Sequence, residues 1–212
     1  MKDADGREYA VKSTSTHDET LQREHLIYGS LQMRGLSNMI PKVYNFEKLP
    51  HENVMIMEML GTSLLDEIEC KGHFSVEEAL RVGRCLLSDV RKMHAAGVVH
   101  LDIALRNIVR GRAGTVCANS IYLIDFGDGQ DFATYEDGLD IDRDTCLGFY
   151  SYGLACQQDI RDLMESVILM AEDCSPDRAH DLSKKYNTVD EYLRQIEHNE
   201  NIDYDFIESF LS

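Results

Sequence analysis

The pattern of apolar and polar positions in residues 1–60 predicts a small sheet with one helix packed on it. Residues 6–13, GREYAVKS, alternate as a half-buried strand does. Residues 19–35 have apolar side chains at helical spacing and end at a glycine. These apolar positions are Leu21, Leu26, Tyr28 and Leu31. Residues 39–49 and 53–60 are then typical of two strands joined by the short connection PHE.

A break at Gly61 separates this part from a mainly helical remainder. Ser75 and Glu78 have the spacing of a capping box, and they precede a long helix that we expect to end at Gly97. The buried stripe of this helix is expected to contain Ala79, Val82, Leu86, Val90 and Met93.

Further along the chain, residues 121–124 form a short β-rich run, and Asp125 follows directly after its last residue. Residues 133–145 have no clear period and are expected to form a loop, whereas residues 157–173 fit a buried helix. After a mixed segment, two more helices are expected around residues 189–197 and 203–211.

The segment VVHLDIALRNIV, residues 98–109, places four polar side chains in a stretch otherwise suited to a core. These are His100, Asp102, Arg106 and Asn107. A buried loop that carries both an aspartate and an asparagine indicates a specific chemical use. We interpret His100 as a packing and hydrogen-bonding element of the loop rather than a proton carrier.

Phosphoryl transfer needs metal ions on the phosphates, a cation on the non-transferred phosphates and an acceptor for the proton of the attacking hydroxyl. Asp102 and Asn107 follow the long helix, Asp125 leaves a strand, and Lys12 ends the first strand, where Glu24 can pair with it. Each part is common when it occurs alone, since an Asp-Phe-Gly tripeptide is usually a turn. Their order and spacing together favour this chemistry.

On these residues the sequence resembles the eukaryotic protein kinases, and within them casein kinase I and the related vaccinia-type kinases. The matching segments are EHLIYGSLQ, NVMIMEMLGTSL, VVHLDIALRNIV, IYLIDFG, RDLMESVILM, YLRQIE and IDYDFIESF. The resemblance implies an α+β, bilobal fold. Residues 1–60 would form a truncated, β-rich N-lobe, and residues 61–212 a mainly helical C-lobe with the catalytic loop and the Asp-Phe-Gly segment.

The resemblance also implies roles for individual residues. Lys12 would contact the phosphates of ATP, Glu24 would pair with it, and Asp102 would be the catalytic base. Asn107 and Asp125 would hold Mg²⁺. The nucleotide's base would lie beside Met57 as gatekeeper and meet backbone groups of Glu58 and Leu60.

The sequence departs from the family ahead of Lys12. Kinases normally place a strand, a glycine-rich loop and a second strand there, whereas eleven residues precede Lys12. We therefore expect the loop that covers the phosphates to be absent, since Gly6 alone cannot supply several backbone N–H groups. Weak ATP binding and a chain shortened from a longer gene product both remain open.

Two further departures lie in the catalytic loop. Leu101 replaces the usual arginine before the catalytic aspartate, so regulation by a phosphate on the activation loop is not expected. Ala104 replaces the lysine of serine/threonine kinases, and DIALRN resembles the tyrosine-kinase pattern, in which Arg106 would supply the cation. A surface salt bridge is the equally weighted alternative for Arg106.

The net charge and the composition limit the classes of partner that the protein is expected to bind. The chain has 212 residues and a formal net charge of −17, so we expect it to repel nucleic acid and anionic membranes. It has no membrane-spanning run or signal peptide, which favours the cytoplasm or nucleus. Its six cysteines have no close pairing and are expected to be reduced and mostly buried.

The segment from Asp125 to Arg161 bears on the substrate because it is strongly acidic. It carries Asp128, Asp131, Glu136, Asp137, Asp140, Asp142 and Asp144, against Arg143. A protein substrate that is basic around the acceptor follows from this charge. A solvated acidic loop without a substrate role is the alternative.

Three functions remain open at this point. The first is a protein kinase that transfers the γ-phosphoryl group of ATP to Ser or Thr, with Tyr not excluded. The second is a kinase-like module that acts by binding, with another kinase or an activator as its partner. Small-molecule phosphotransferases share parts of the pattern, but the small-lobe helix and the segment MEMLGTSL count against them.

Overall fold

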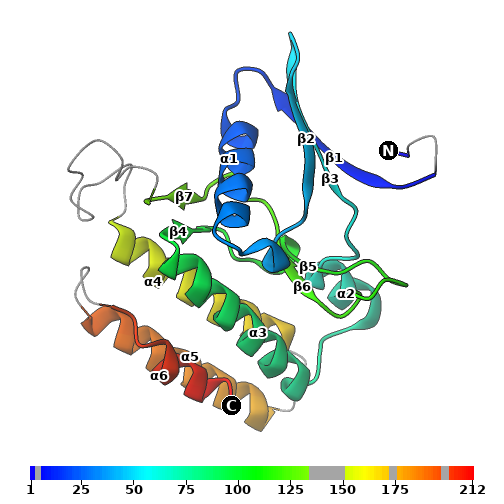
Figure 1. Cartoon of the computed structure of the whole chain (residues 1–212). Coiled ribbons are helices and arrows are strands. Elements are labelled where there is room, and N and C mark those ends of the chain that lie inside the picture. Colours follow the sequence, from blue (N-terminus) through cyan, green and yellow to red (C-terminus); the bar gives the residue numbers. More distant parts are fainter. Residues whose placement is uncertain (3–5, 134–150, 172–175, 197–200) are drawn as a thin grey trace.

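The computed structural model describes residues 1–2, 6–133, 151–171, 176–196 and 201–212. In Figure 1, a β-rich N-terminal part with one long helix stands above a mainly helical C-terminal part. The predicted α+β class is therefore confirmed. Within the described residues, no helix is both long enough and apolar enough to cross a bilayer.

A three-stranded antiparallel sheet forms the β-rich part. Its strands are β1 (Tyr9–Ser15), β2 (Val43–Lys48) and β3 (Glu52–Glu58), in the order β1-β3-β2. Along the central strand β3 every second residue is buried, because side chains of a strand alternate between its two faces. The pairing sets Lys12 opposite Met55.

Helix α1 (Thr20–Met33) packs against this sheet, as Figure 1 shows. Its buried stripe contains Leu21, Glu24, Ile27, Tyr28 and Leu31, which recur at steps of three and four. Leu26, expected in the stripe, is instead 61% exposed, because it lies five residues after Leu21 and so points away from that face. A glutamate occupies the interior instead.

Two helices begin the C-terminal part. The sequence analysis missed α2 (Leu64–Lys71), although Ser63 and Asp66 form a capping box at its start. Helix α3 (Val76–Ala95) was predicted, and all five residues of its expected apolar stripe are buried.

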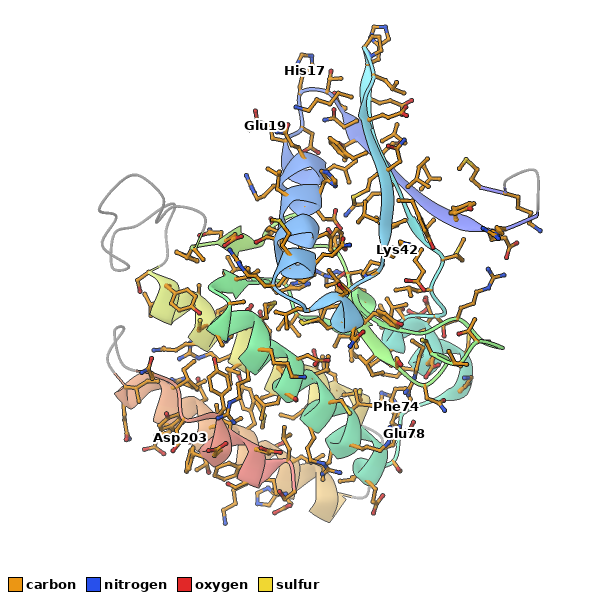
Figure 2. All side chains as sticks on the ribbon, in the orientation of Figure 1. His17, Glu19, Lys42, Phe74, Glu78 and Asp203 are labelled. Carbon is orange, nitrogen blue, oxygen red and sulfur yellow. The ribbon has the colours of Figure 1, made fainter. Side chains whose placement is uncertain are left out.

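The predicted capping box of α3 is only half formed. Ser75 Oγ accepts a hydrogen bond from the backbone N–H of Glu78 at 3.2 Å, as expected. The Glu78 carboxylate instead accepts from Arg110 at 3.2 Å, and the Arg110 guanidinium lies 5.8 Å from the centre of the Phe74 ring. Figure 2 shows Phe74 and Glu78 together at the start of α3. The arginine competes successfully for the carboxylate because it offers a charged donor.

Two pairs of very short strands follow α3. Strand β4 (Val98–Val99) pairs with β7 (Gln130–Asp131), and β5 (Ile108–Arg110) pairs with β6 (Ile121–Leu123). A 3-10 turn at Leu105–Asn107 precedes β5. The polar segment noted in the sequence therefore runs between two strands that are each anchored by a partner, which limits its freedom.

Three helices complete the described chain: α4 (Tyr152–Met170), α5 (Pro176–Gln195) and α6 (Tyr204–Phe210). Helix α4 begins earlier than predicted, and α5 is one helix where a mixed segment was expected. Its buried residues Leu182, Val189 and Leu193 recur at helical spacing. The expected loop at residues 133–145 lies outside the described residues beyond position 133.

One apolar core runs through both parts of the molecule. It includes Leu21 from α1, Met55 from β3, Leu86 from α3 and Leu163 from α4. Phe126 belongs to the same cluster and is fully buried. The sheet and the helices are therefore held together by continuous packing as well as by the chain connection.

The described cysteines are free thiols, as expected, but their burial differs from the expectation. Cys156 is buried and Cys117 is half-buried, whereas Cys70 and Cys85 are exposed. Cys146 and Cys174 lie outside the described residues. The two exposed cysteines lie on the solvent sides of α2 and α3, where helical spacing rather than residue type decides exposure.

The link after β3 is fixed by close backbone contact. Gly61 N–H donates to the carbonyl of Arg110 at 2.8 Å, and a Cβ at Gly61 would lie 2.7 Å from the carbonyl oxygen of Gly111. A Cβ at Gly111 would in turn overlap the carbonyl of Cys117. Both positions need glycine because backbone occupies the space of a side chain.

We expect Gly111→Ala to lower the free energy of unfolding by about 1 to 3 kcal/mol, because the carbonyl of Cys117 can retreat only if the turn moves. Urea unfolding followed by circular dichroism measures this change. Gly29→Ala is the matched control: Gly29 lies inside α1 with no atom within 4 Å of an added Cβ, so alanine should stabilise by up to about 1 kcal/mol. Equal stability of the two variants would contradict the close contact.

Candidate active site

Lys12 lies on β1 and forms two short ion pairs. Its Nζ is 2.7 Å from Glu24 Oε2 and 2.7 Å from Asp125 Oδ1. Burial alone would lower the pKa of Lys12, but hydrogen bonds from its ammonium to Asp125 and Glu24 and their charges raise it. The lysine is therefore a permanent cation, held between a helix and the segment after β6.

Glu24 is a buried charged residue, with its side chain 1% exposed. One carboxylate oxygen accepts from Lys12 and the other accepts from the Tyr28 hydroxyl at 2.9 Å. Burial first, and then the charge of Glu24, raise the pKa of Tyr28 well above its ordinary value, so this hydroxyl keeps its proton. A buried carboxylate is tolerated here because both oxygens are bonded.

The same tyrosine holds the backbone of Asp125. Tyr28 Oη accepts a hydrogen bond from Asp125 N–H at 3.2 Å, and the Tyr28 ring meets the Phe126 ring edge-on at 5.3 Å. Asp125 has a φ of 65°, a left-handed conformation that few residues other than glycine adopt. The helix that supplies Glu24 thus also fixes where the Asp125 carboxylate points.

Asp102 lies in the loop between β4 and β5, close to two donors. Asn107 Nδ2 donates to Asp102 Oδ2 at 2.7 Å and to the Asp102 carbonyl at 3.0 Å. Arg106 Nη2 lies 2.6 Å from Oδ1 and 2.7 Å from Oδ2. The Asp102 side chain stays 29% exposed, so the carboxylate is oriented by the loop and still open to a substrate.

The Arg106 contact bears on the two interpretations of this residue. Its side chain is 59% exposed, as a surface residue would be, yet it pairs with the candidate base rather than with a remote carboxylate. The structure therefore places a cation directly against the Asp102 carboxylate.

His100 is fully buried below the same loop. Its Nε2 donates to the carbonyl of Ile124 at 3.0 Å and its Nδ1 accepts from Asp102 N–H at 3.2 Å. Burial lowers the pKa of His100 below its ordinary value, so the ring is neutral. Its ring centre also lies 4.4 Å from that of Phe126. The predicted packing and hydrogen-bonding role is confirmed.

Asp159 on α4 holds the backbone at the start of this loop, and the sequence analysis missed it. Its two carboxylate oxygens accept from the N–H groups of His100 at 2.8 Å and Leu101 at 2.7 Å. Leu101 has a φ of 64°, which costs free energy for a residue with a Cβ. His94 on α3 adds a third contact to Asp159, at 2.9 Å.

A sequence signal for Asp159 did exist. The residue lies on the apolar stripe of α4 between buried neighbours, and its side chain is 0% exposed. A charged residue on the buried face of a helix requires strong partners, because burial of an unpaired charge is costly. The same argument identifies Glu24 on α1.

The residues expected to meet the nucleotide's base lie at the end of β3. Met57 is 8% exposed and pairs with Ala10 on β1. Glu58 N–H donates to the carbonyl of Lys42 at 2.8 Å, and Leu60 follows just before Gly61. Strand β1 thus contacts both the end of β3, through Ala10, and the segment after β6, through the ion pair of Lys12 with Asp125.

The residues present fit Mg²⁺ by their donor chemistry. Asn107 uses its nitrogen on Asp102, which leaves its amide oxygen, and Asp125 offers a carboxylate that is 48% exposed. Oxygen donors of this kind are the ligands that Mg²⁺ prefers, with phosphate oxygens completing its shell. Within the described residues, no group of three or more His, Cys, Asp or Glu side chains is arranged to hold a metal by itself.

The acidic segment after Asp125 is only partly described. Asp131 is bonded to the C-terminal end of α1 by contacts with Ser30 and with Arg34 Nη1, the latter at 3.1 Å. This aspartate therefore has a structural role. Residues 136, 137, 140, 142, 143 and 144, on which the expectation of a basic substrate also depends, lie outside the described residues.

A hollow of about 340 Å³ opens beside Asp102, between the catalytic loop, α2 and α4. We call it the acidic hollow; its lining includes Leu65, Asp102, Arg106, Asp162, Glu165 and Leu169. Burial raises the pKa of Asp162 to about 6, and the charges of Asp159, Glu165 and Asp102 add to this. Gln158 Nε2 donates to Asp162 at 2.7 Å and offsets part of the effect.

We expect Tyr28→Phe to lower the free energy of unfolding by about 2 kcal/mol, because the Asp125 N–H and Glu24 both lose a partner. Urea unfolding measures the loss. Tyr44→Phe serves as the control, since that side chain is 49% exposed and should change little. A Tyr28 variant as stable as the Tyr44 variant would refute the bridging role.

Asp162→Asn should raise the free energy of unfolding above pH 6. The folded pKa of Asp162 lies above the ordinary value of 3.8, so ionisation opposes folding. The gain should therefore shrink as the pH falls from about 6 towards 3.8 and vanish below that value. Paired denaturation curves of both proteins across this range test the sign. A variant that is less stable at pH 7.5 would contradict it.

Comparisons with known proteins agree with this geometry. The Protein kinase domain family matches residues 1–148. Casein kinase I homolog 2 of Schizosaccharomyces pombe is 36% identical over 89 residues, which are 42% of this chain and 20% of that protein. A probable casein kinase I homolog of Encephalitozoon cuniculi is 30% identical over 129 residues, 58% of this chain and 40% of that protein.

Human ribosomal protein S6 kinase alpha-4 is 36% identical over 128 residues, which are 58% of this chain and 16% of that protein. The chain thus spans less than half the length of these curated relatives. The family match covers more than half of the chain, and the paired lysine, the loop aspartate and the Asp-Phe-Gly segment meet at one site. The chain therefore belongs to the eukaryotic-type protein kinase family and is most like casein kinase I.

Proposed function

We propose that this protein is an active protein kinase that transfers the γ-phosphoryl group of ATP to a Ser or Thr hydroxyl of a protein substrate. The observation that carries the proposal is the position of Lys12 Nζ, 2.7 Å from both Glu24 and Asp125. This contact joins β1, α1 and the segment after β6 in one ionic unit. Phosphoryl transfer depends on such preorganised charges more than on covalent chemistry.

In this mechanism, Asp102 accepts the proton of the attacking hydroxyl. Asn107 holds the carboxylate in place through its bond to Oδ2, and Asp159 fixes the backbone that precedes it. A positioned carboxylate is effective because it needs no reorganisation when the proton moves. The left-handed Leu101 turns the loop so that Asp102 stays partly exposed while His100 is buried.

Lys12 neutralises the phosphates that are not transferred, and Glu24 and Tyr28 keep its ammonium in position. Asn107 and Asp125 would hold Mg²⁺, which supplies positive charge to the phosphate oxygens. The base of ATP would rest beside Met57 and bond the backbone of Glu58 and Leu60. Residues 1–60 and 61–212 act as two lobes around this nucleotide.

Arg106 supplies a second cation in place of the lysine that Ala104 replaces. Its nitrogen lies close to both oxygens of Asp102, so a substrate phosphoryl oxygen that approaches the base also approaches this charge. The position of the arginine in DIALRN keeps a Tyr hydroxyl open as a second acceptor type.

The second candidate is a kinase-like module that acts by binding. Its partner would be another kinase, which it regulates, or an activator. It is favoured by the same Arg106 contact, because both carboxylate oxygens of Asp102 already accept from this donor. In that case the hydroxyl of a substrate would find the base occupied. The two functions differ in whether the Asp102 carboxylate is used.

The first experiment measures transfer of labelled phosphate from Mg-ATP to histone by the natural protein and by Asp102→Asn. We expect transfer by the natural protein and a loss of at least about 100-fold in the variant, because the general base is removed. Asp89→Asn, which changes a half-buried acid on α3 that pairs with Lys92, is the matched control and should keep its activity. Equal transfer by all three proteins would refute the role of Asp102.

A thermal shift with Mg-ATP, compared with Asp125→Ala, separates the two candidates. Folded natural protein and folded Asp102→Asn that both lack transfer would support the binding module. A rise in melting temperature with Mg-ATP that disappears in Asp125→Ala would support a nucleotide site, because a ligand that binds only the native state stabilises it.

A further inference from the structure

The acidic hollow is continuous with the catalytic loop. Its lining includes Asp102 and residues 103–106, Asp162, Glu165 and Leu169 on α4, and Leu65 on α2. Any protein segment that brings a hydroxyl to Asp102 therefore places neighbouring side chains at the mouth of this hollow. The feature is a hollow next to Asp102, with Asp162 half-buried and Glu165 exposed in its lining.

The hollow has an excess of negative charge. Arg106 lines it, but this guanidinium is paired with Asp102 and so cancels that carboxylate. Asp162 and Glu165 lie three residues apart on the same face of α4. Within the described part of the chain, no lysine or arginine forms an ion pair with either of them, whereas the adjacent Arg161 pairs with Asp190. Two carboxylates thus remain for an external cation.

The carboxylate of Asp162 opposes the stability of the free protein. Its side chain is half-buried, and it faces the charges of Asp159, Glu165 and Asp102. Asparagine would keep the hydrogen bond from Gln158 without the charge. A charge that is unfavourable in the unliganded state becomes favourable when a cation binds beside it, and functional sites often hold groups of this kind.

The walls of the hollow are suited to an aliphatic stem. Leu65 on α2 and Leu169 on α4 line the space and are 37% and 39% exposed. Long basic side chains bury their methylene groups on apolar surface while the charged end meets polar partners. A purely apolar side chain would match only the apolar walls, and an acidic side chain would be repelled by the carboxylates of Asp162 and Glu165.

We propose that the acidic hollow binds an arginine side chain of the substrate, close to the residue that is phosphorylated. Asp162 and Glu165 receive the guanidinium, and Leu65 and Leu169 contact its stem. The proposal rests on the proposed kinase function for its choice of occupant. Arginine is favoured over lysine because its planar fork donates to two carboxylates at once. These residues set specificity and take no part in the chemistry.

The test uses peptides with one serine acceptor in which a single arginine is moved through the neighbouring positions, each compared with the same peptide carrying glutamine. We expect one position at which arginine raises kcat/KM and tightens binding, measured separately by fluorescence anisotropy. In Asp162→Asn/Glu165→Gln, the ratio between the arginine and glutamine peptides should fall by about 10-fold or more in both measurements. In Glu191→Gln, an exposed position on α5, the ratio should keep its natural value.

Charge reversal gives a second, independent variant. Glu165→Lys should favour a peptide with glutamate over arginine at the same position, because the sign of the contact is inverted. A natural protein whose binding does not distinguish arginine from glutamine at any position would overturn the proposal. So would an arginine preference that Asp162→Asn/Glu165→Gln leaves unchanged.

The two readouts separate this proposal from the kinase function. Arginine-selective binding that depends on Asp162 and Glu165, without any phosphate transfer, supports the hollow and refutes the kinase function. Phosphate transfer that is lost in Asp102→Asn but is indifferent to arginine supports the kinase function and refutes the hollow.

Discussion

The buried carboxylate of Asp159 is the constraint on which the geometry of the site depends. Removal of a carboxylate from water costs several kcal/mol unless donors replace the lost hydration. Here the replacement comes from two backbone N–H groups of the catalytic loop and from His94. The same bonds stabilise Leu101 in a left-handed conformation, so they offset both the burial of the charge and the strain of the loop.

This arrangement explains why the loop can present an aspartate at the surface of a packed interior. His100 turns inward and bonds the carbonyl of Ile124, which immediately precedes Asp125. Asn107, itself 4% exposed, bonds back to Asp102. The loop and the Asp-Phe-Gly segment are therefore positioned by shared hydrogen bonds, and the distance between the Asp102 and Asp125 carboxylates follows from the fold.

Much of the fold was predictable because its main elements have clear periods. The alternation in β3 and the stripe of α3 are visible in the sequence, and so is the order Lys12, Glu24, Asp102, Asn107 and Asp125. The strands at Val98–Val99 and Gln130–Asp131 were not predictable, because two residues contain no period and their pairing depends on distant partners. Glu78 could not be assigned to Arg110 either, since that contact is set by tertiary packing.

The site was predictable as a set of residues but less so as a network. The order of the motif residues along the sequence identified the candidate charged groups. Tyr28 and Asp159 instead act through contacts with residues that are distant in the sequence. Both lie on the buried faces of helices. Tyr28 is tolerated there because its ring is apolar, and Asp159 because its carboxylate is hydrogen-bonded. Aromatic residues on such stripes usually serve packing alone, and only the position of the Tyr28 hydroxyl reveals its second role.

Phe126 gives this network a mechanical consequence. Its ring lies between Tyr28 on α1 and His100 in the catalytic loop, in contact with both. A rigid, close-packed ring transmits displacement, because a void on either side would lose contacts. A change in the tilt of α1 would therefore displace a ring that also packs against His100. One buried side chain thus joins the packing of that helix to the loop that carries Asp102.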